Sequence, residues 1–494
     1  MRRAISILLA VAFGAAALVA VVLRVTGNRD TSVGPNVLVN TPGIVDAHNS
    51  PSLARDPRDP SVVVASHRID RPGFSAELDH SADGGRTWGS TALPLPRGLD
   101  RPYAPDVAFA PDGTLYVTYV DLRGNGNVPA DLWISKSTDG GQTLSAPVRI
   151  AGQLAFQARL AIDHAGTVYV TWLQGGAAGL LSLVGPPSPI VVARSSDGGR
   201  TFSRPIHLSD PSRALVGAAT PVIDSGGRLV VLYEDFKGDQ RDFQNLPGPP
   251  WDHPFALVVT RPVGASAFAK GVQLEAGLVP DQRFLVYTPE FPSMAAGPRN
   301  TLYVAWADAR NGDSDVFLRR SDDGGATWSP ATRVNGNRKG DGTSQYLPQV
   351  GVAPDGRVDV LFLDRTRDRK HNVSMDATLA SSHDQGKSFQ YARLTSRSFD
   401  SRVGSSAGPQ LPVDFGSRLA LAGTSGRSLA AWTDTRLGSA ATGRQDIFAA
   451  SYSVPAAPGG FTGIPVIGVL ALLTLAFAGL ALSPGATHRR DAAR

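Results

Sequence analysis

The chain has 494 residues, of which 42% are hydrophobic, so it is long enough to bury one large core or several small ones. It contains no cysteine, which excludes disulfide bridges and thiolate metal sites. The formal net charge of +5 arises at the two ends, and the segment between them carries 42 basic and 42 acidic residues. A neutral central segment gives no indication of nucleic-acid binding.

The first predicted element is a continuous apolar run at residues 4–23, which follows Arg2 and Arg3. A helix needs about 20 apolar residues to cross the hydrocarbon core of a bilayer. The run is longer than the apolar part of most signal peptides and no A-x-A site follows it, which favours an uncleaved anchor over a cleaved peptide. We therefore assign residues 1–27 to a signal anchor or signal peptide.

Seven segments then share one pattern, in which two β-rich stretches are joined by a turn. They begin near Pro51, Pro105, Ala158, Pro221, Pro292, Pro348 and Arg418. Val, Tyr, Thr and Trp alternate at period two around PDG or AG turns, which is typical of paired strands. In five segments a third strand, an Asp-Gly-Gly stretch and a fourth strand follow. The pattern predicts an all-β fold, a β-propeller of seven four-stranded blades over residues 36–455.

The seventh segment lacks a fourth strand of its own. Near the start of the chain, Asn36–Thr41 resembles Ala331–Asn337, which is a predicted fourth strand elsewhere. We therefore predict that Asn36–Thr41 pairs into the seventh blade and closes the ring, which removes an exposed sheet edge.

The Asp-Gly-Gly stretches lie between the third and fourth strands of five blades. Glycine adopts the positive φ that such a turn requires, the Asp accepts backbone N–H bonds across the turn, and an aromatic residue covers it. Each Asp belongs to a different blade, so we interpret these residues as structural. The aspartates are Asp83, Asp139, Asp197, Asp323 and Asp384.

These stretches match the Asp-box S-x-D-x-G-x-T-W, or BNR repeat, and the chain resembles the sialidase (neuraminidase) superfamily of propellers. The resemblance implies a glycoside hydrolase of the exo-α-sialidase type. In that family three arginines hold the carboxylate of an acidic sugar, a Tyr assisted by a Glu is the nucleophile, and an Asp is the acid/base. Asp-boxes also occur in propellers without this activity, so a non-catalytic propeller that binds a glycan or a protein is the alternative.

The resemblance places the site on the face opposite the Asp-boxes, where the chain enters the first strand of each blade. The residues two positions before the proline-like position form a predicted ring: Asn49, Tyr103, Phe156, Ala219, Glu290, Tyr346 and Phe415. Asn49 and Glu290 stand where the family carries the arginine of its R-I-P motif. Tyr346 and Glu290 are the candidate nucleophile and its assisting carboxylate, and Asp70 is the candidate acid/base.

Guanidinium groups bind a carboxylate through two parallel hydrogen bonds, and aromatic rings stack on sugars. The candidate substrate-binding residues are Arg68, Arg159, Arg418, Tyr103 and Trp251. Alternatively, Arg159 and Arg418 form structural salt bridges with neighbours such as Asp106.

A D-x-R motif recurs after the second strand of three blades, and we interpret it as an ion pair that braces a loop. The three copies are Asp121–Arg123, Asp308–Arg310 and Asp434–Arg436. The acidic stretch Asn311–Asp315 could offer oxygen ligands to Ca²⁺, but a lone D-x-D is a weak signal. No cofactor and no metal site are therefore predicted.

The chain ends with a predicted linker at residues 456–462, an apolar helix at 463–482 and a tail at 483–494. Arginines lie on the outer flank of both apolar runs, which predicts both termini in the cytoplasm and the propeller on the extracytoplasmic side of the cell membrane. The expected partners are a glycan or glycoconjugate, and the membrane through the terminal helices.

Overall fold

The computed structural model describes residues 31–125, 127–152, 154–175, 188–238, 253–262, 270–279, 291–405 and 413–455. Both predicted membrane helices, the whole predicted linker and the predicted tail lie outside these ranges. Within them, no helix has the length and apolar character that a membrane crossing requires.

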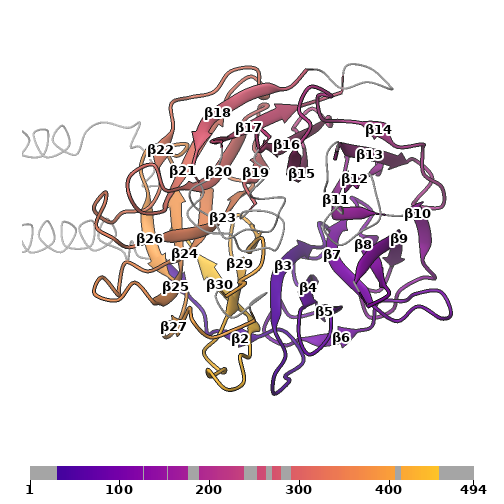
Figure 1. Cartoon of the computed structure of the whole chain (residues 1–494), viewed down its shortest axis with the longest axis horizontal. Helices are drawn as coiled ribbons and strands as arrows, with labels where there is room; N and C mark the ends of the chain where they lie inside the picture. The colour runs from indigo at the N-terminus through magenta and orange to yellow at the C-terminus, as the bar shows by residue number, and fades with distance from the viewer. Residues whose placement is uncertain are drawn as a thin grey trace, which may run out of the picture. The chain divides into compact units, whose positions relative to one another are not determined.

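The described strands form seven sheets (Figure 1). Six are built from strands that follow one another in the chain, and the seventh combines the last three strands with the first two. Blade 1 contains β3 (His48–Arg55), β4 (Val63–Ile69), β5 (Ser75–Ser81) and β6 (Gly89–Thr91). Blade 2 contains β7 (Pro102–Phe109), β8 (Leu115–Arg123), β9 (Val128–Ser137) and β10 (Val148–Gly152). Blade 3 contains β11 (Ala155–Ile162), β12 (Val168–Gln174), β13 (Ile190–Ser195) and β14 (Ile206–His207). Blade 4 contains β15 (Val216–Ile223), β16 (Leu229–Asp235), β17 (Phe255–Thr260) and β18 (Val272–Leu278).

The remaining three blades follow the same order. Blade 5 contains β19 (Ser293–Ala296), β20 (Leu302–Asp308), β21 (Asp315–Ser321) and β22 (Thr332–Arg333). Blade 6 contains β23 (Gln345–Val352), β24 (Val358–Asp364), β25 (Ser374–Ser382) and β26 (Gln390–Arg393), with β27 (Phe399–Asp400) also paired to β25. Blade 7 contains β28 (Ala420–Ala422), β29 (Ser428–Asp434) and β30 (Asp446–Ser453), together with β1 (Ser32–Val33) and β2 (Val37–Leu38).

The first strands of successive blades contact one another around the ring, and β28 contacts β3, so the array is closed. The prediction of a seven-bladed propeller of four-stranded blades is therefore confirmed. The second strands β16, β20 and β29 are buried along their whole length. Such strands are covered by a neighbouring blade on each side, which explains why they are mostly apolar rather than strictly alternating.

The N-terminal segment completes blade 7. In β2, Val37 pairs with Ala449 and Leu38 pairs with Phe448, and β1 pairs with the end of β30. Val39 is buried against Ala65 of blade 1 in the core that joins blades 7 and 1. The predicted closure by Asn36–Thr41 is thus confirmed, and β30 has no open edge where β2 covers it.

Five of the seven first strands have an irregularity near their start, where the register shifts and one residue adopts a positive φ. These residues are Ser50, Ala104, Gln157, Ala218 and Leu347. The residue before Ala218 is Gly217, so the predicted ring position Ala219 is wrong by two residues. A shift of two keeps every side chain on the same side of a strand, so the alternating pattern does not distinguish the two registers.

The Asp-boxes form the turns that follow the third strands, as the turn of blade 5 illustrates. The Ser321 hydroxyl donates to Asp323 at 2.8 Å and accepts the Gly325 N–H at 2.7 Å, while Thr327 donates to Asp323 through its N–H and hydroxyl. Partial burial opposes ionisation, but these hydrogen bonds lower the pKa of Asp323 to about 2. The same arrangement of bonds recurs at Asp83, Asp139, Asp197 and Asp384.

Replacing Ser321 with alanine is expected to lower the free energy of unfolding by about 1–3 kcal/mol, because the buried Gly325 N–H loses its acceptor. Chemical denaturation of the full chain measures the change, with Lys387→Ala at an exposed position of the blade 6 turn as control. Because the pKa of Asp323 is depressed in the folded state, the contribution of its carboxylate to the free energy of unfolding is present above about pH 4. This contribution is lost as the pH falls towards 2. Equal stabilities of the two variants would contradict the structural role of the turn.

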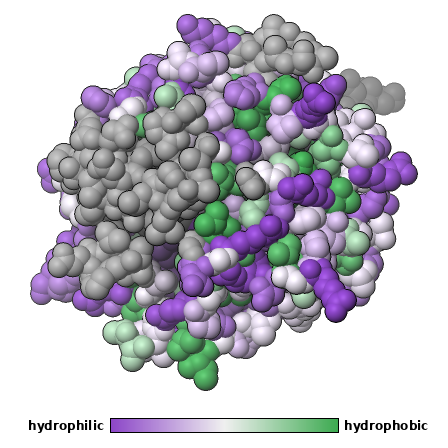
Figure 2. Space-filling model, turned by 45° about the vertical axis from the view of Figure 1, so that its right-hand side comes forward, coloured by the Kyte–Doolittle hydropathy of each residue, from purple (hydrophilic) through white to green (hydrophobic). Residues whose placement is uncertain are grey.

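On the face seen in Figure 2, hydrophilic and hydrophobic side chains are interspersed.

We call the side of the ring where the first strands begin and the second strands end the upper face. In blade 1, His48 at the start of β3 pairs with Ile69 at the end of β4 on this face. The Asp-box turns follow the opposite ends of the third strands, so they lie on the lower face.

Candidate functional site

Five polar side chains meet on the upper face, where β3 and β7 begin and β4 ends. Arg68 lies between two carboxylates, with its Nη2 atom 2.6 Å from Asp414 Oδ2 and 3.1 Å from Asp70 Oδ2. Asp70 also accepts hydrogen bonds from the Tyr103 hydroxyl at 2.6 Å and from the Asn49 amide at 2.8 Å. We call these five residues the Asp70 cluster. The sequence analysis selected Arg68, Asp70 and Tyr103, and the structure brings all three together.

The Asp70 cluster contains one guanidinium and two carboxylates, and both burial and this charge imbalance affect the pKa values of its acidic groups. Burial raises the pKa of Asp414 to about 6, with Arg68 opposing the shift and Asp70 adding to it. Burial also raises the pKa of Tyr103 well above its usual value, and the Asp70 carboxylate contributes in the same direction. The Tyr103 phenol therefore stays protonated at neutral pH and donates to Asp70.

A second group consists of Asp106, Arg159 and Arg418, and we call it the Asp106 cluster. Asp106 and Arg159 lie on the first strands of blades 2 and 3, and Arg418 lies just before the first strand of blade 7. Arg159 Nε and Arg418 Nη2 each lie 3.7 Å from an oxygen of Asp106. The two Asp106 oxygens instead accept shorter hydrogen bonds, from the Ser52 hydroxyl at 2.6 Å and from the Leu160 N–H at 2.9 Å. Two cations therefore share one carboxylate that is already hydrogen-bonded elsewhere.

The two arginines of this cluster have few other anionic contacts. Arg418 donates to the Pro105 carbonyl at 2.7 Å and to the Pro51 carbonyl at 3.2 Å. Arg159 Nη1 is buried and has no hydrogen-bond partner in the described part of the chain. Burial lowers the pKa of Arg418, and the neighbouring Arg159 lowers it further, with a smaller contribution from Arg68. A guanidinium stays charged in proteins, so the lowered pKa reflects first the burial of this charge and second the neighbouring charge of Arg159, which Asp106 partly offsets.

The structure bears out the alternative that Arg159 and Arg418 form salt bridges with Asp106, although both distances are at the long end for an ion pair.

The D-x-R motifs form the predicted ion pairs: Arg123 with Asp121, Arg310 with Asp308 and Arg436 with Asp434. In the stretch considered for Ca²⁺, Asp315 is bonded to Arg333 at 2.9 Å, so this carboxylate already has a cationic partner.

Tyr346 occupies a different environment from the Asp70 cluster. Its side chain is 1% exposed and packs in the core beside Leu347, Phe399 and Phe415. Arg365 donates to the Tyr346 hydroxyl at 2.9 Å, and its guanidinium lies 4.7 Å from the centre of the ring. The predicted roles of Glu290 and Trp251 fall on residues outside the described ranges.

Three residues that contact the predicted site residues were missed by the sequence analysis. Asp414 lies 346 residues from Arg68 in the chain and belongs to no motif. Arg365 follows β24 without a repeated partner that would single it out. Phe74 is 36% exposed and packs edge-on against Tyr103, with 5.5 Å between the ring centres. An exposed aromatic in a loop is a weak signal, because single exposed hydrophobic residues are common.

Comparison with known proteins finds no family model and no curated protein that matches the chain. Several solved structures are similar at low identity. An ulvan lyase, described as a new family of polysaccharide lyase, is 11% identical over 81% of this chain and 93% of its own, with a TM-score of 0.47. The α-L-arabinanase of Penicillium chrysogenum is 15% identical over 73% and 96%, with a TM-score of 0.42. A Hadza microbial sialidase is 17% identical over 78% and 75%, with a TM-score of 0.43.

Among the described residues, the side chains close enough to hold a metal ion together are His48, His67 and Glu77. They lie on the side of the blade 1 sheet that faces blade 7, whereas Arg68 lies on the other side. The Asp70 and Asp106 clusters are thus sites for charge and hydrogen bonding, separate from this group.

Proposed function

We propose that the protein is a membrane-anchored, extracytoplasmic propeller that binds a terminal acidic sugar through Arg159 and Arg418. One observation carries the proposal: these two guanidinium groups share the single carboxylate of Asp106, and Arg159 Nη1 is left without a partner in the described ranges. A ligand carboxylate would supply the missing negative charge and accept parallel hydrogen bonds from a planar guanidinium.

The neighbouring aromatic pair supports a sugar as the carrier of that carboxylate. Phe74 is partly exposed against Tyr103, and the Tyr103 ring lies 5.9 Å from the guanidinium carbon of Arg68. A sugar offers one apolar face to an aromatic ring and hydroxyl groups to polar side chains such as Asp70 and Asn49. We infer that the aromatic pair and the Asp70 cluster orient a pyranose ring.

A second candidate function is hydrolysis of the glycosidic bond by an exo-α-sialidase type of mechanism. The hydrogen bond of 2.6 Å from Tyr103 to Asp70 favours it, because Asp70 is placed to accept the phenol proton as the Tyr103 oxygen attacks the anomeric carbon. The bond from that carbon to the aglycone oxygen breaks in the same step, and the proton taken up by Asp70 is available to the departing oxygen. Tyr346 with Glu290 is the pair that the family resemblance proposes for the same step, with Asp70 as the acid/base.

Binding and turnover are separated by one experiment on the full chain kept in detergent. We expect saturable binding of sialosides or uronic-acid glycosides by calorimetry, and none of matched neutral glycosides. Release of the aglycone from an aryl sialoside would establish a glycosidase, whereas binding without release would establish a binding module. Equal affinity for acidic and neutral glycosides would contradict both proposals.

Anchoring through residues 1–27 and 463–482 is part of the proposal and is tested separately. The full chain should sediment with membranes and resist extraction by high salt. Protease added outside intact cells should cleave the propeller but leave the 483–494 tail in the cytoplasm. Recovery of the chain in the soluble fraction would contradict this part of the proposal.

The affinity for an acidic sugar is expected to rise by roughly threefold between pH 7 and pH 5. Protonation of Asp414, whose pKa is about 6, removes one negative charge that faces Arg68 and Asp70 and makes the region more positive. Tyr103 stays protonated throughout, and the sugar carboxylate stays ionised. Calorimetry at both pH values measures the change, and in Asp414→Asn the affinity should not vary with pH. An affinity that falls on acidification would contradict the role of Asp414.

A further inference from the structure

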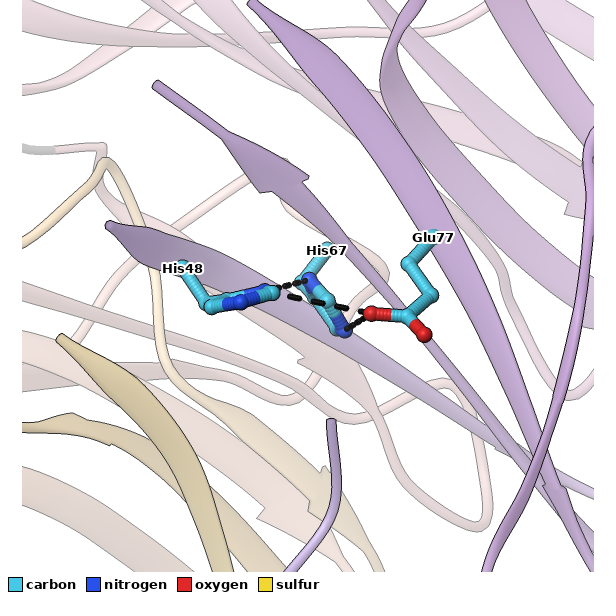
Figure 3. A group of neighbouring side chains, drawn as sticks. All are labelled: His48, His67 and Glu77. Carbon is cyan, nitrogen blue, oxygen red and sulfur yellow. Dashed lines mark hydrogen bonds and ion pairs between the residues drawn. The ribbon is translucent and has the colours of Figure 1, made fainter. Parts of the chain in front are cut away.

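Three side chains of blade 1, from two buried histidines and one partly buried glutamate, point their polar atoms towards one another (Figure 3). His48 comes from β3, His67 from β4 and Glu77 from β5. The Nδ1 atoms of the two histidines are 3.3 Å apart, and Glu77 Oε2 lies 3.9 Å from His48 Nδ1 and 3.7 Å from His67 Nε2. The histidine side chains are 1% and 0% exposed, so bulk water does not reach these nitrogens.

The hydrogen bonds around the histidines constrain where their protons lie. Asp79 Oδ2 is 2.9 Å from His67 Nε2, which places a proton on that nitrogen, and in the neutral ring His67 Nδ1 then carries a lone pair. His48 Nδ1 faces this lone pair. If His48 carries its proton on Nδ1, its buried Nε2 lone pair has no hydrogen-bond partner in the described part of the chain and faces the Asp46 carboxylate 3.8 Å away. If the proton is on Nε2, two Nδ1 lone pairs face each other at 3.3 Å.

We propose that this group is a zinc site, in which Zn²⁺ is bound by His48 Nδ1, His67 Nδ1 and Glu77 Oε2. With Zn–N bonds of about 2.0–2.1 Å and tetrahedral angles, two ligand nitrogens lie about 3.3 Å apart. The two Nδ1 atoms already have this separation. Glu77 Oε2 lies 3.9 Å from His48 Nδ1 and needs to move by about 0.6 Å to reach the same spacing. Its contact with His67 is to Nε2, at 3.7 Å, so the carboxylate also has to turn towards Nδ1. A cation between the Nδ1 atoms removes the conflict between their lone pairs.

The surrounding groups are arranged as partners of metal ligands usually are. Asp79 accepts from His67 Nε2, and Asp46 lies beside His48 Nε2, so each histidine has a carboxylate behind the nitrogen that faces away from the ion. Thr41 and Ser90 both donate to Glu77 Oε1 at 2.6 Å, which leaves Oε2 turned towards the histidines.

The charge balance also favours a cation. Glu77, Asp79 and Asp46 contribute three carboxylates near the two rings, while Arg444, which also acts on His48, is paired with Asp446. Nitrogen and carboxylate donors without a thiolate suit Zn²⁺ among divalent metals that are commonly available.

The location of the site indicates a structural role. Val63, Ala65 and His67 lie on the side of β4 that packs against blade 7, next to Val39 and Ile447. His48 N donates to the Gln445 carbonyl, and Gln445 N donates to the Asp46 carbonyl across the same seam. Thr41, which fixes Glu77, comes from the N-terminal segment that closes the ring. Bound zinc would therefore stabilise the closure between blades 1 and 7.

The test uses the untagged full chain in detergent, prepared with zinc in the growth medium. We expect about one zinc ion per chain by elemental analysis and a fall in Tm of at least about 3 °C when a chelator removes it. His48→Gln and Glu77→Gln should each hold at least fivefold less zinc and show no response of Tm to the chelator. After reconstitution with Co²⁺ alone, the wild-type chain should show visible d–d absorption that His48→Gln lacks.

His80→Gln is the matched control, because His80 also lies on β5 but bonds Thr91 outside the cluster. It should retain zinc and the Tm response of the wild-type chain. A wild-type chain that holds less than about one-fifth of an ion and does not respond to added Zn²⁺ would overturn the proposal. Unchanged zinc content in both ligand variants would overturn it too. If His48→Gln does not fold, Glu77→Gln, which keeps the shape of the side chain, gives the same comparison.

Discussion

Replacing Arg68 with methionine is expected to lower the free energy of unfolding by about 3–5 kcal/mol. The guanidinium is buried and forms the ion pairs to both Asp70 and Asp414, besides donating to Asn49. Methionine fills a similar volume but leaves two buried carboxylates without a cation. The loss therefore comes from the desolvation of unpaired charges rather than from a cavity.

Urea denaturation of the full chain measures this loss, and Arg402→Met is the matched control. Arg402 pairs with Asp400 on the surface, where 72% of its side chain is exposed, so its removal should leave the stability unchanged within error. In Arg68→Met the folded pKa of Asp414 should rise further above its unfolded value. A carboxyl with a raised folded pKa loses stability as the pH rises, so the variant should recover stability between pH 7 and pH 5. If Arg68→Met is as stable as the wild type at pH 7, water hydrates the Asp70 and Asp414 carboxylates in the variant, and the expected loss from unpaired buried charges is contradicted.

Replacing Arg159 with glutamine is expected to weaken the binding of an acidic sugar by about 10- to 100-fold, since a charge-assisted hydrogen bond contributes about 1.5–3 kcal/mol. Arg159 Nη1 has no hydrogen-bond partner among the described residues, so it is the donor that a ligand carboxylate can use without breaking a bond recorded there. Arg418→Gln should have a similar or smaller effect, because Arg418 already donates to two carbonyl groups.

Calorimetric titration of a methyl sialoside or a methyl uronide into the full chain measures both affinities. Arg149→Gln is the control, because this arginine of blade 2 is 56% exposed and pairs with Asp131 away from the Asp106 cluster. Its affinity should equal that of the wild type. If Arg159→Gln folds normally and binds the acidic sugar as tightly as the control, the Asp106 cluster is not the binding site.

The repeated pattern of the sequence was sufficient to predict the propeller. Alternation at period two, turn residues and the Asp-boxes act between residues that are close in the chain, so they can be read locally. The closure by Asn36–Thr41 was also predictable, because a blade without a fourth strand leaves an edge that some segment has to cover. The structure places Arg68, Asp70 and Tyr103 side by side, and the roles in substrate binding and catalysis that the sequence suggested for them stay predictions.

The predictions were weaker where the repeat itself is irregular. Gly217 rather than Ala219 occupies the ring position of blade 4, since a two-residue shift preserves the alternation. The burial of Tyr346 beside Arg365 depends on packing between blades that no repeat encodes. His48 and His67 are separated by 19 residues without a metal-binding motif, and only strand pairing brings them together.

By itself the sequence determined the class of fold, the number of blades, the structural turns and the two apolar runs that predict membrane anchoring. The tertiary structure decided which charged groups meet. Asp414 reaches Arg68 across 346 residues, and Arg418 reaches Asp106 from blade 7 to blade 2. Both contacts exist only because the ring closes, and the energy of a buried charge depends on all of its neighbours in space rather than on those adjacent in the chain.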